Sequence, residues 1–255
     1  MIRIRVTREA GIGRITLARP EKKNALDQTM ATELHTALLS LDADSEVHVV
    51  LLAADGDDFC AGADLEALES LIEASRDELT SDAKALGRVF LAMRAMTKPV
   101  VAAVRGRALA GGAGLATACD MVLAHENAQF GYPEVRVGFV PAMVMNMLRR
   151  SVGEKRAFDL AVTGRLISAR EAVELGLASR LIIAEEWTSG IESTAEMLAK
   201  LPSNAVQMTK RLFYELDGRH FEDGIALGVE TNVAARETED FKEGVRRFVR
   251  RSRQR

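Results

Sequence analysis

The chain contains few cysteine, proline and aromatic residues. Its 255 residues include two cysteines, five prolines and one tryptophan, and aromatic side chains make up only 5%. Cys60 and Cys119, with no leader pattern at the N-terminus, exclude a disulfide framework and are typical of a reducing compartment. No apolar run approaches the roughly 20 residues that a membrane span needs. We therefore expect a soluble cytoplasmic protein with no membrane partner.

A strong charge of one sign is also absent, since 34 Lys and Arg face 37 Asp and Glu, for a net charge of −3. This balance gives no general attraction to nucleic acid, and only the C-terminus is clearly basic. The sequence lacks a phosphate-binding Walker loop, a His-Glu-x-x-His helix and a Gly-x-Ser-x-Gly elbow. The four histidines are scattered, so we predict no metal site. The 47% hydrophobic content is enough for one large core.

Apolar periodicity predicts that strands and helices alternate over the first half of the chain. Asp27 is the predicted cap of the first helix, and Thr97-Lys98-Pro99 ends the second. The acidic segment from Glu66 to Ser81 is weakly ordered by pattern and is a possible lid. The predicted strands are 2–6, 14–17, 47–54, 100–104 and 121–124, and the predicted helices are 27–41 and 83–96.

Beyond Pro141 the pattern becomes largely helical. Ser168 can cap one of these helices, and Pro202 marks a boundary before the last quarter. No low-complexity linker separates the segments, so we expect them to pack on the core or on a neighbouring subunit. The predicted helices are 142–150, 154–162, 169–175, one from Ser203 or Asn204, 221–235, and one from Thr238 or Asp240.

A glycine-rich turn lies between a buried strand and a helix at Arg105–Asp120, and Phe59–Leu65 forms a second strand-to-helix corner of small residues. The free N–H groups at such a turn can bind an anion, as in an oxyanion hole. Close packing of helix on strand is an alternative explanation for the glycines.

These motifs, in this order, resemble the crotonase or enoyl-CoA hydratase/isomerase superfamily over nearly the whole chain. The resembling segments are Lys22-Lys23-Asn24-Ala25-Leu26, Phe59–Leu65, Ala108–Asp120, Phe130-Gly131-Tyr132-Pro133-Glu134, Thr163-Gly164-Arg165 and Glu171–Leu177. The resemblance implies an α/β fold, with a spiral of ββα repeats over residues 1–200. It also implies a helical C-terminal region, residues 201–255, that builds homotrimers or hexamers. The substrate would be an acyl-CoA thioester, with CoA as part of the substrate and no cofactor.

The resemblance also assigns the site residues. The backbone amides of Ala63 and Gly111 would form the oxyanion hole that stabilises a thioester enolate, and Glu134 would be the general acid and base. Partial burial would raise the pKa of Glu134 toward a useful range. The implied CoA-binding residues are Lys22, Lys23, Ala25, Ala61, Asp64, Leu65 and, from a neighbouring subunit, Phe248 and Arg251.

Gly114 departs from the family pattern, because typical hydratases carry a second glutamate there. Water addition uses both carboxylates, whereas a double-bond shift needs one base. We therefore predict a Δ3/Δ2-type enoyl-CoA isomerase, or a specialised hydratase, that uses Glu134 alone. Asp64 and Glu66 are possible substitute acids or simple helix-terminal charges. Decarboxylation, hydrolysis and ring-forming or ring-opening reactions remain alternatives because they use the same oxyanion hole.

The acyl pocket would be lined by the segment from Glu66 to Ser81 and by Phe139–Met147. Methionines 143, 145 and 147 indicate either a pliable apolar wall or ordinary core packing.

The arginines at 246, 247, 250, 251, 253 and 255 raise a different possibility, a noncatalytic RNA-binding protein. A solvated helix end that complements its own dipole is the alternative, and no aromatic ladder supports nucleic-acid readout. We expect no nucleic-acid partner.

Overall fold

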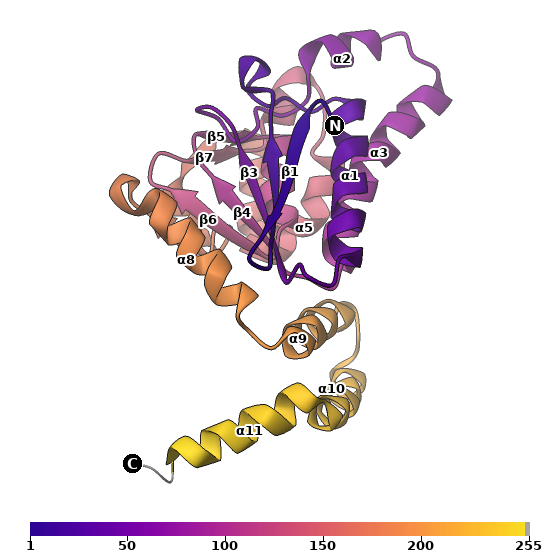
Figure 1. Cartoon of the computed structure of the whole chain (residues 1–255). Helices are drawn as coiled ribbons and strands as arrows, with labels where there is room; N and C mark the ends of the chain where they lie inside the picture. The colour runs from indigo at the N-terminus through magenta and orange to yellow at the C-terminus, as the bar shows by residue number, and fades with distance from the viewer. Residues whose placement is uncertain (253–255) are drawn as a thin grey trace.

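A six-stranded sheet forms the centre of the molecule in the computed structural model, which describes residues 1–252 (Figure 1). The strand order is β1-β2-β3-β4-β6-β9; β1 pairs antiparallel with β2, and every other pairing is parallel. These strands are β1 (Ile4–Glu9), β2 (Ile12–Leu17), β3 (Val49–Ala54), β4 (Val100–Val104), β6 (Met121–His125) and β9 (Arg180–Ile182).

A second, three-stranded sheet consists of β5 (Arg107–Leu109), β7 (Gln129–Gly131) and β8 (Leu166–Ser168). The chain alternates between the sheets: β4 and β6 lie in the large one, and β5 and β7, which follow them, lie in the small one. A helical segment comes after each of these strand pairs. The result is the spiral of ββα repeats that the family resemblance implied.

Helices cover both faces of the large sheet. Val50 and Leu52 of β3 belong to the main core, whereas Val49 and Leu51 face a second cluster that includes Ile191 of α8. A strand buried on both faces explains the continuous apolar run that predicted β3. Figure 1 shows α8 on one side of the sheet and α1 and α3 on the other. The helices before residue 200 are α1 (Gln28–Ala43), α2 (Leu65–Ser70), α3 (Arg76–Ala95), α4 (Gly111–Ala118), α5 (Ala142–Val152), α6 (Glu154–Thr163), α7 (Ala169–Leu175) and α8 (Trp187–Ala199), with 3-10 turns η1 (Pro20–Lys22), η2 (Pro133–Val137) and η3 (Ala184–Glu186).

The segment from Glu66 to Ser81 is mostly helical, so the prediction of weak order there was wrong. It contains most of α2 and the first turns of α3. Asp64 caps α2, and Ser75 forms a reciprocal capping box with Glu78 at the start of α3. These local hydrogen bonds satisfy the helix N-termini and order an otherwise polar segment.

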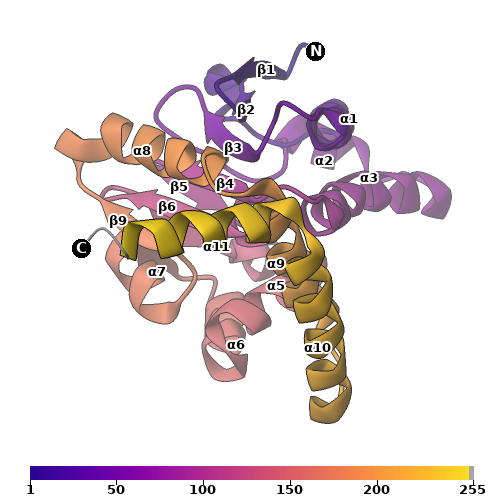
Figure 2. The ribbon, with the colours of Figure 1, turned by 60° about the horizontal axis from the view of Figure 1, so that its bottom comes forward.

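The last three helices are α9 (Ser203–Glu215), α10 (Phe221–Glu237) and α11 (Glu239–Ser252). They extend away from the sheets, with α10 and α11 farthest from α2 in Figure 1, and Figure 2 shows α11 running crosswise to α10. A buried contact holds α9 to the body: Lys210 Nζ lies 2.7 Å from Asp120 Oδ2, and Tyr214 donates to the other oxygen at 2.7 Å. Apolar side chains of α10 and α11 are exposed at Phe221, Ile225, Val229, Val233, Phe241 and Phe248.

The predicted helix boundaries are otherwise close to those observed, and Asp27 and Ser168 cap α1 and α7 as expected. Cys60 and Cys119 are buried free thiols. Within residues 1–252, no helix has the length and apolar character of a membrane span. Arg253 and Arg255 lie outside the described residues.

Candidate active site

The first corner, Phe59–Asp64, connects β3 to α2 and is hydrogen-bonded to the segment before α1. The Leu26 amide donates to Gly62 O at 2.7 Å, and the Asp64 amide donates to Leu26 O at 2.8 Å. These two bonds bracket Ala63, whose own N–H has no hydrogen-bond acceptor within residues 1–252. The first corner therefore presents a free amide at Ala63.

A buried guanidinium holds this corner in place. Arg19 donates to Ala25 O at 2.9 Å, to Asp27 at 3.0 Å and to Asp64 Oδ2 at 2.8 Å, and its side chain is almost fully buried. Burial alone would raise the pKa of Asp64, but hydrogen bonds from Arg19 and from the amides of Glu66 and Ala67 outweigh it and lower that pKa. Asp64 is therefore an ionised structural group.

Arg19 is a positioning residue that the sequence analysis missed. Its only signal was an arginine directly after an apolar strand, which more often lies at the surface. Buried Asn24 was missed as a polar contact too: it accepts from the Arg19 amide at 2.9 Å and donates to Asp55 O and Asp58 O.

The second corner lies between β5 and α4. Ala110 adopts φ 49° and ψ −122°, a conformation that side-chain-bearing residues rarely adopt, and its amide donates to Gly131 O at 2.8 Å. Gly111 is the first residue of α4, and its N–H has no acceptor within residues 1–252. A helix N-terminus leaves such amides free and adds positive potential.

The two corners are in direct contact. A Cβ placed on Gly62 would lie 3.1 Å from the Cβ of Ala110, and one on Gly112 would lie 2.2 Å from Cys60 O. Ala63 follows Gly62 and Gly111 follows Ala110, so the contact between Gly62 and Ala110 brings the two free amides near each other. For Gly112 the packing interpretation is therefore correct, whereas Gly111 has the free amide that the oxyanion interpretation requires.

Glu134 is the second residue of the turn η2, which follows β7, and it is only 9% exposed. Its Oε2 is buried without a hydrogen-bond partner among the described residues. Burial raises the pKa of Glu134, as expected from the sequence. The preceding Tyr132 is fully buried, and its hydroxyl lies 2.8 Å from Thr117 Oγ1 on α4. This contact, together with the bond from Ala110 to Gly131, ties the Glu134 segment to the second corner.

The position of the missing second acid is filled by apolar side chains. A Cβ on Gly114 would lie 2.7 Å from Val144 Cγ2 and 3.1 Å from Phe90 Cζ. A glutamate would require these side chains to move. The surrounding packing therefore matches the absence of a carboxylate.

The structure places the proposed CoA-binding residues in two separate regions. Lys22, Lys23 and Ala25 lie beside Ala61, whose amide donates to Lys23 O at 3.0 Å. Asp64 and Leu65 continue this region at the start of α2. Phe248 and Arg251 are exposed on α11, far from α2 in Figure 1. One chain alone does not bring the two groups together.

The possible substitute acids are engaged elsewhere. Asp64 binds Arg19 and caps α2, and Glu66 forms an ion pair with Lys22. Among residues 1–252, no group of three or more His, Cys, Asp or Glu side chains could hold a metal ion. Of the three methionines, Met143 lines a surface groove, Met147 packs against the core and Met145 is half-buried.

Comparison with known proteins agrees with this geometry. The sequence profile of the family described as enoyl-CoA hydratase/isomerase matches residues 7–255. The chain is 44% identical to a putative enoyl-CoA hydratase of Thermus thermophilus, with 90% of each chain covered. It is 34% identical to a probable enoyl-CoA hydratase of Mycobacterium bovis, with 96% and 94% covered. The crystal structure of an enoyl-CoA hydratase from Mycobacterium smegmatis superposes with a TM-score of 0.93 at 33% identity, covering 98% and 96%.

Proposed function

Because this chain is an enzyme of the enoyl-CoA hydratase/isomerase family, which acts on acyl-CoA thioesters, we propose that it shifts the double bond of an enoyl-CoA, with Glu134 as its single acid and base. One observation carries the proposal. Glu134 has a buried, unpartnered oxygen, while Phe90 and Val144 occupy the space around Gly114. A double-bond shift needs one group that takes and returns a proton, and this site offers one.

In the proposed mechanism, the thioester oxygen lies between the amides of Ala63 and Gly111. Glu134 takes a proton from Cα of a β,γ-enoyl-CoA, and the electron pair moves onto the thioester oxygen as a dienolate. The two amides stabilise that charge; loss of one such donor typically costs about 3–4 kcal/mol in the transition state. The protonated Glu134 then returns the proton to Cγ, which leaves the double bond between Cα and Cβ.

Hydration is a second candidate, favoured by the names of the relatives, which include hydratases. It requires that Glu134 alone activate the water and protonate Cα. Mass separates the two reactions, because isomerisation conserves the mass of the enoyl-CoA and hydration adds one water. We expect the β,γ-enoyl-CoA to be converted without a change in mass.

The test of the assigned base is Glu134→Gln. We expect kcat to fall by about 10²–10⁴-fold, the range for loss of a positioned acid or base. Glu243→Gln, on the exposed face of α11, is the matched control and keeps full turnover. Full turnover by Glu134→Gln would show that another group removes the proton.

We also propose that CoA binds along Lys22, Lys23, Ala25, Ala61, Asp64 and Leu65, and that Phe248 and Arg251 reach it from a neighbouring copy. The exposed cation of Lys23 supports the binding of CoA phosphate. The exposed apolar residues of α10 and α11 support assembly into a homotrimer or a hexamer. Sedimentation of the purified chain measures the assembly, and a monomer with full activity would contradict it. If the copies do assemble in this way, the arginines of α11 serve CoA rather than RNA.

A further inference from the structure

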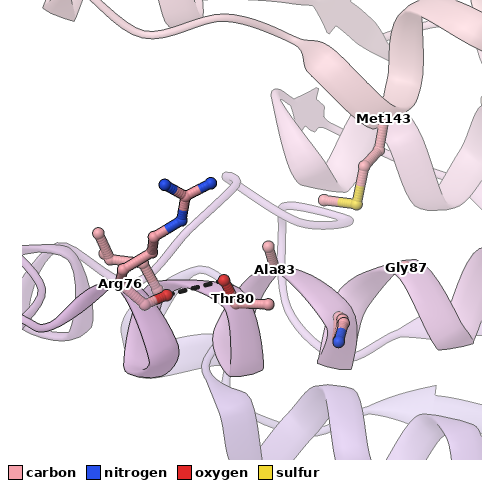
Figure 3. Close-up of a pocket in the computed structure, with 7 residues that line it drawn as sticks. Arg76, Thr80, Ala83, Gly87 and Met143 are labelled. Carbon is pink, nitrogen blue, oxygen red and sulfur yellow. Dashed lines mark hydrogen bonds between the residues drawn. The ribbon is translucent and has the colours of Figure 1, made fainter.

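A groove of about 470 Å³ runs between the first turns of α3 and the first turn of α5 (Figure 3). Met143 of α5 forms one side, and Arg76, Thr80, Lys84 and Gly87 of α3 are among the residues of the other. Figure 3 shows the Arg76 guanidinium projecting from α3 on the side of the helix where Met143 lies. None of the described residues that line the groove is acidic.

This groove lies next to the residues of α3 that pack against Gly111 and Gly114. Phe90 and Val144 cover Gly114, and a Cβ on Gly87, one turn earlier on α3, would lie 3.5 Å from the sulfur of Met143. Leu86, the neighbour of Gly87, lies 3.6 Å from the Cβ position of Gly111. An acyl chain whose thioester lies at Gly111 would reach the groove past the side chains of Leu86 and Met143, neither of which is fully buried.

The groove combines an apolar wall with unpaired positive charge. Arg76 and Lys84 make no ion pair within residues 1–252, whereas Arg94, Arg149 and Arg150 on the neighbouring surface each have a carboxylate partner. Arg76, Thr80 and Lys84 are spaced by four residues, so they share one face of α3. Unpaired cations above an apolar wall suit a ligand that is apolar along its length and anionic at its end.

We propose that this groove binds the distal end of the acyl group, and that this end carries a carboxylate held by Lys84 and Arg76. The inference rests on the proposed function and specifies its substrate class as ω-carboxyacyl-CoA thioesters. Lys84 precedes Phe90 by six residues, or about 9 Å along the helix axis. That span requires a chain of medium length between the reacting carbons and the carboxylate.

The test compares two substrates of equal length, the β,γ-unsaturated forms of octenoyl-CoA and octenedioyl-CoA. The measured quantity is the ratio of kcat/KM for octenedioyl-CoA to kcat/KM for octenoyl-CoA. In the double variant Arg76→Met and Lys84→Met we expect this ratio to fall about tenfold, as loss of two exposed charge contacts allows. Arg88→Met, an exposed cation of α3 outside the groove, should keep the wild-type ratio.

Each outcome has one meaning. A ratio that falls only in the double variant supports the carboxylate site. An unchanged ratio overturns it, and equal loss on both substrates would assign these cations to the CoA phosphates instead. Absence of any product from both substrates in the wild-type chain, with octanedioyl-CoA still bound in a Lys84-dependent manner by calorimetry, would reject the proposed reaction while keeping the groove.

Discussion

The two corners of the site each have a buried carboxylate nearby, and the two groups have opposite properties. Asp64 at the first corner is 5% exposed, and Glu134 beside the second is 9% exposed. Asp64 accepts hydrogen bonds from Arg19 and from two amides, which lower its pKa. Glu134 has an oxygen without a partner, and burial raises its pKa. Both side chains have little exposure to solvent, but the hydrogen bonds to Asp64 keep it ionised, whereas Glu134 has fewer partners and stronger desolvation, both of which favour its protonated form.

The corners are also held by different forces. The first depends on polar contacts, since Arg19 joins Ala25, Asp27 and Asp64. The second depends on close packing, because Gly112 leaves no space for a side chain against Cys60. The first should therefore respond to loss of charge, and the second to added volume.

The largest expected effect on stability is that of Arg19→Met. Removing one partner of a buried ion pair typically costs about 3–5 kcal/mol, because the other charge remains buried. Urea unfolding measures the change in the free energy of unfolding. The control is Arg5→Met, which breaks the exposed pair with Asp55 and should cost less than about 1 kcal/mol. If both variants lose the same amount, the buried network does not hold the first corner.

Gly112→Ala should have the next largest effect on stability. Its Cβ would meet Cys60 O at 2.2 Å, and the backbone must shift to relieve the clash. Overpacking of this kind costs about 1–3 kcal/mol. Displacement of the neighbouring Gly111 amide should also lower kcat/KM by about 10²-fold, which is the effect of a misplacement near 1 Å.

The matched control for that change is Gly244→Ala, in α11, where a Cβ meets nothing within 4 Å. Alanine favours the helix there, so we expect equal or slightly higher stability. Wild-type kcat/KM in Gly112→Ala would show that the second corner tolerates volume and that close packing does not position it.

The sequence predicted the elements of this site that depend on local pattern. Apolar periodicity identified strands of the large sheet, and residue type identified the caps Asp27 and Ser168, whereas the segment that carries Glu134 was identified by its resemblance to the family. Contacts between distant residues were not: Arg19 meets Asp64 across 45 positions, and Phe90 and Val144 converge on Gly114 from two helices. Such contacts leave no periodic signal, because they depend on how the helices pack. The order of the segment from Glu66 to Ser81 was missed because polar capping, rather than an apolar face, fixes its helix starts.

The smallest expected effect is on the pH dependence of the free energy of unfolding, to which Asp64 and Glu134 contribute with opposite signs. Because the pKa of Glu134 is raised, there is a pH range in which the native chain holds a proton that the unfolded chain has lost. The free energy of unfolding therefore falls as pH rises from the unfolded value, about 4.3 for glutamate, through the raised one. Asp64, with its lowered pKa, contributes stability that is present above its unfolded value and lost in acid.

Glu134→Gln removes the charge that is poorly solvated at neutral pH. We expect this variant to be more stable than the wild type there, by on the order of 1 kcal/mol, as when a strained catalytic group is neutralised. The gain should vanish below about pH 4, where both forms are uncharged. Thermal unfolding from pH 3 to pH 8 measures the gain, with Glu243→Gln as the exposed control. A gain that is the same at every pH would mean that the side-chain amide packs better, and that the buried charge of Glu134 does not destabilise the fold.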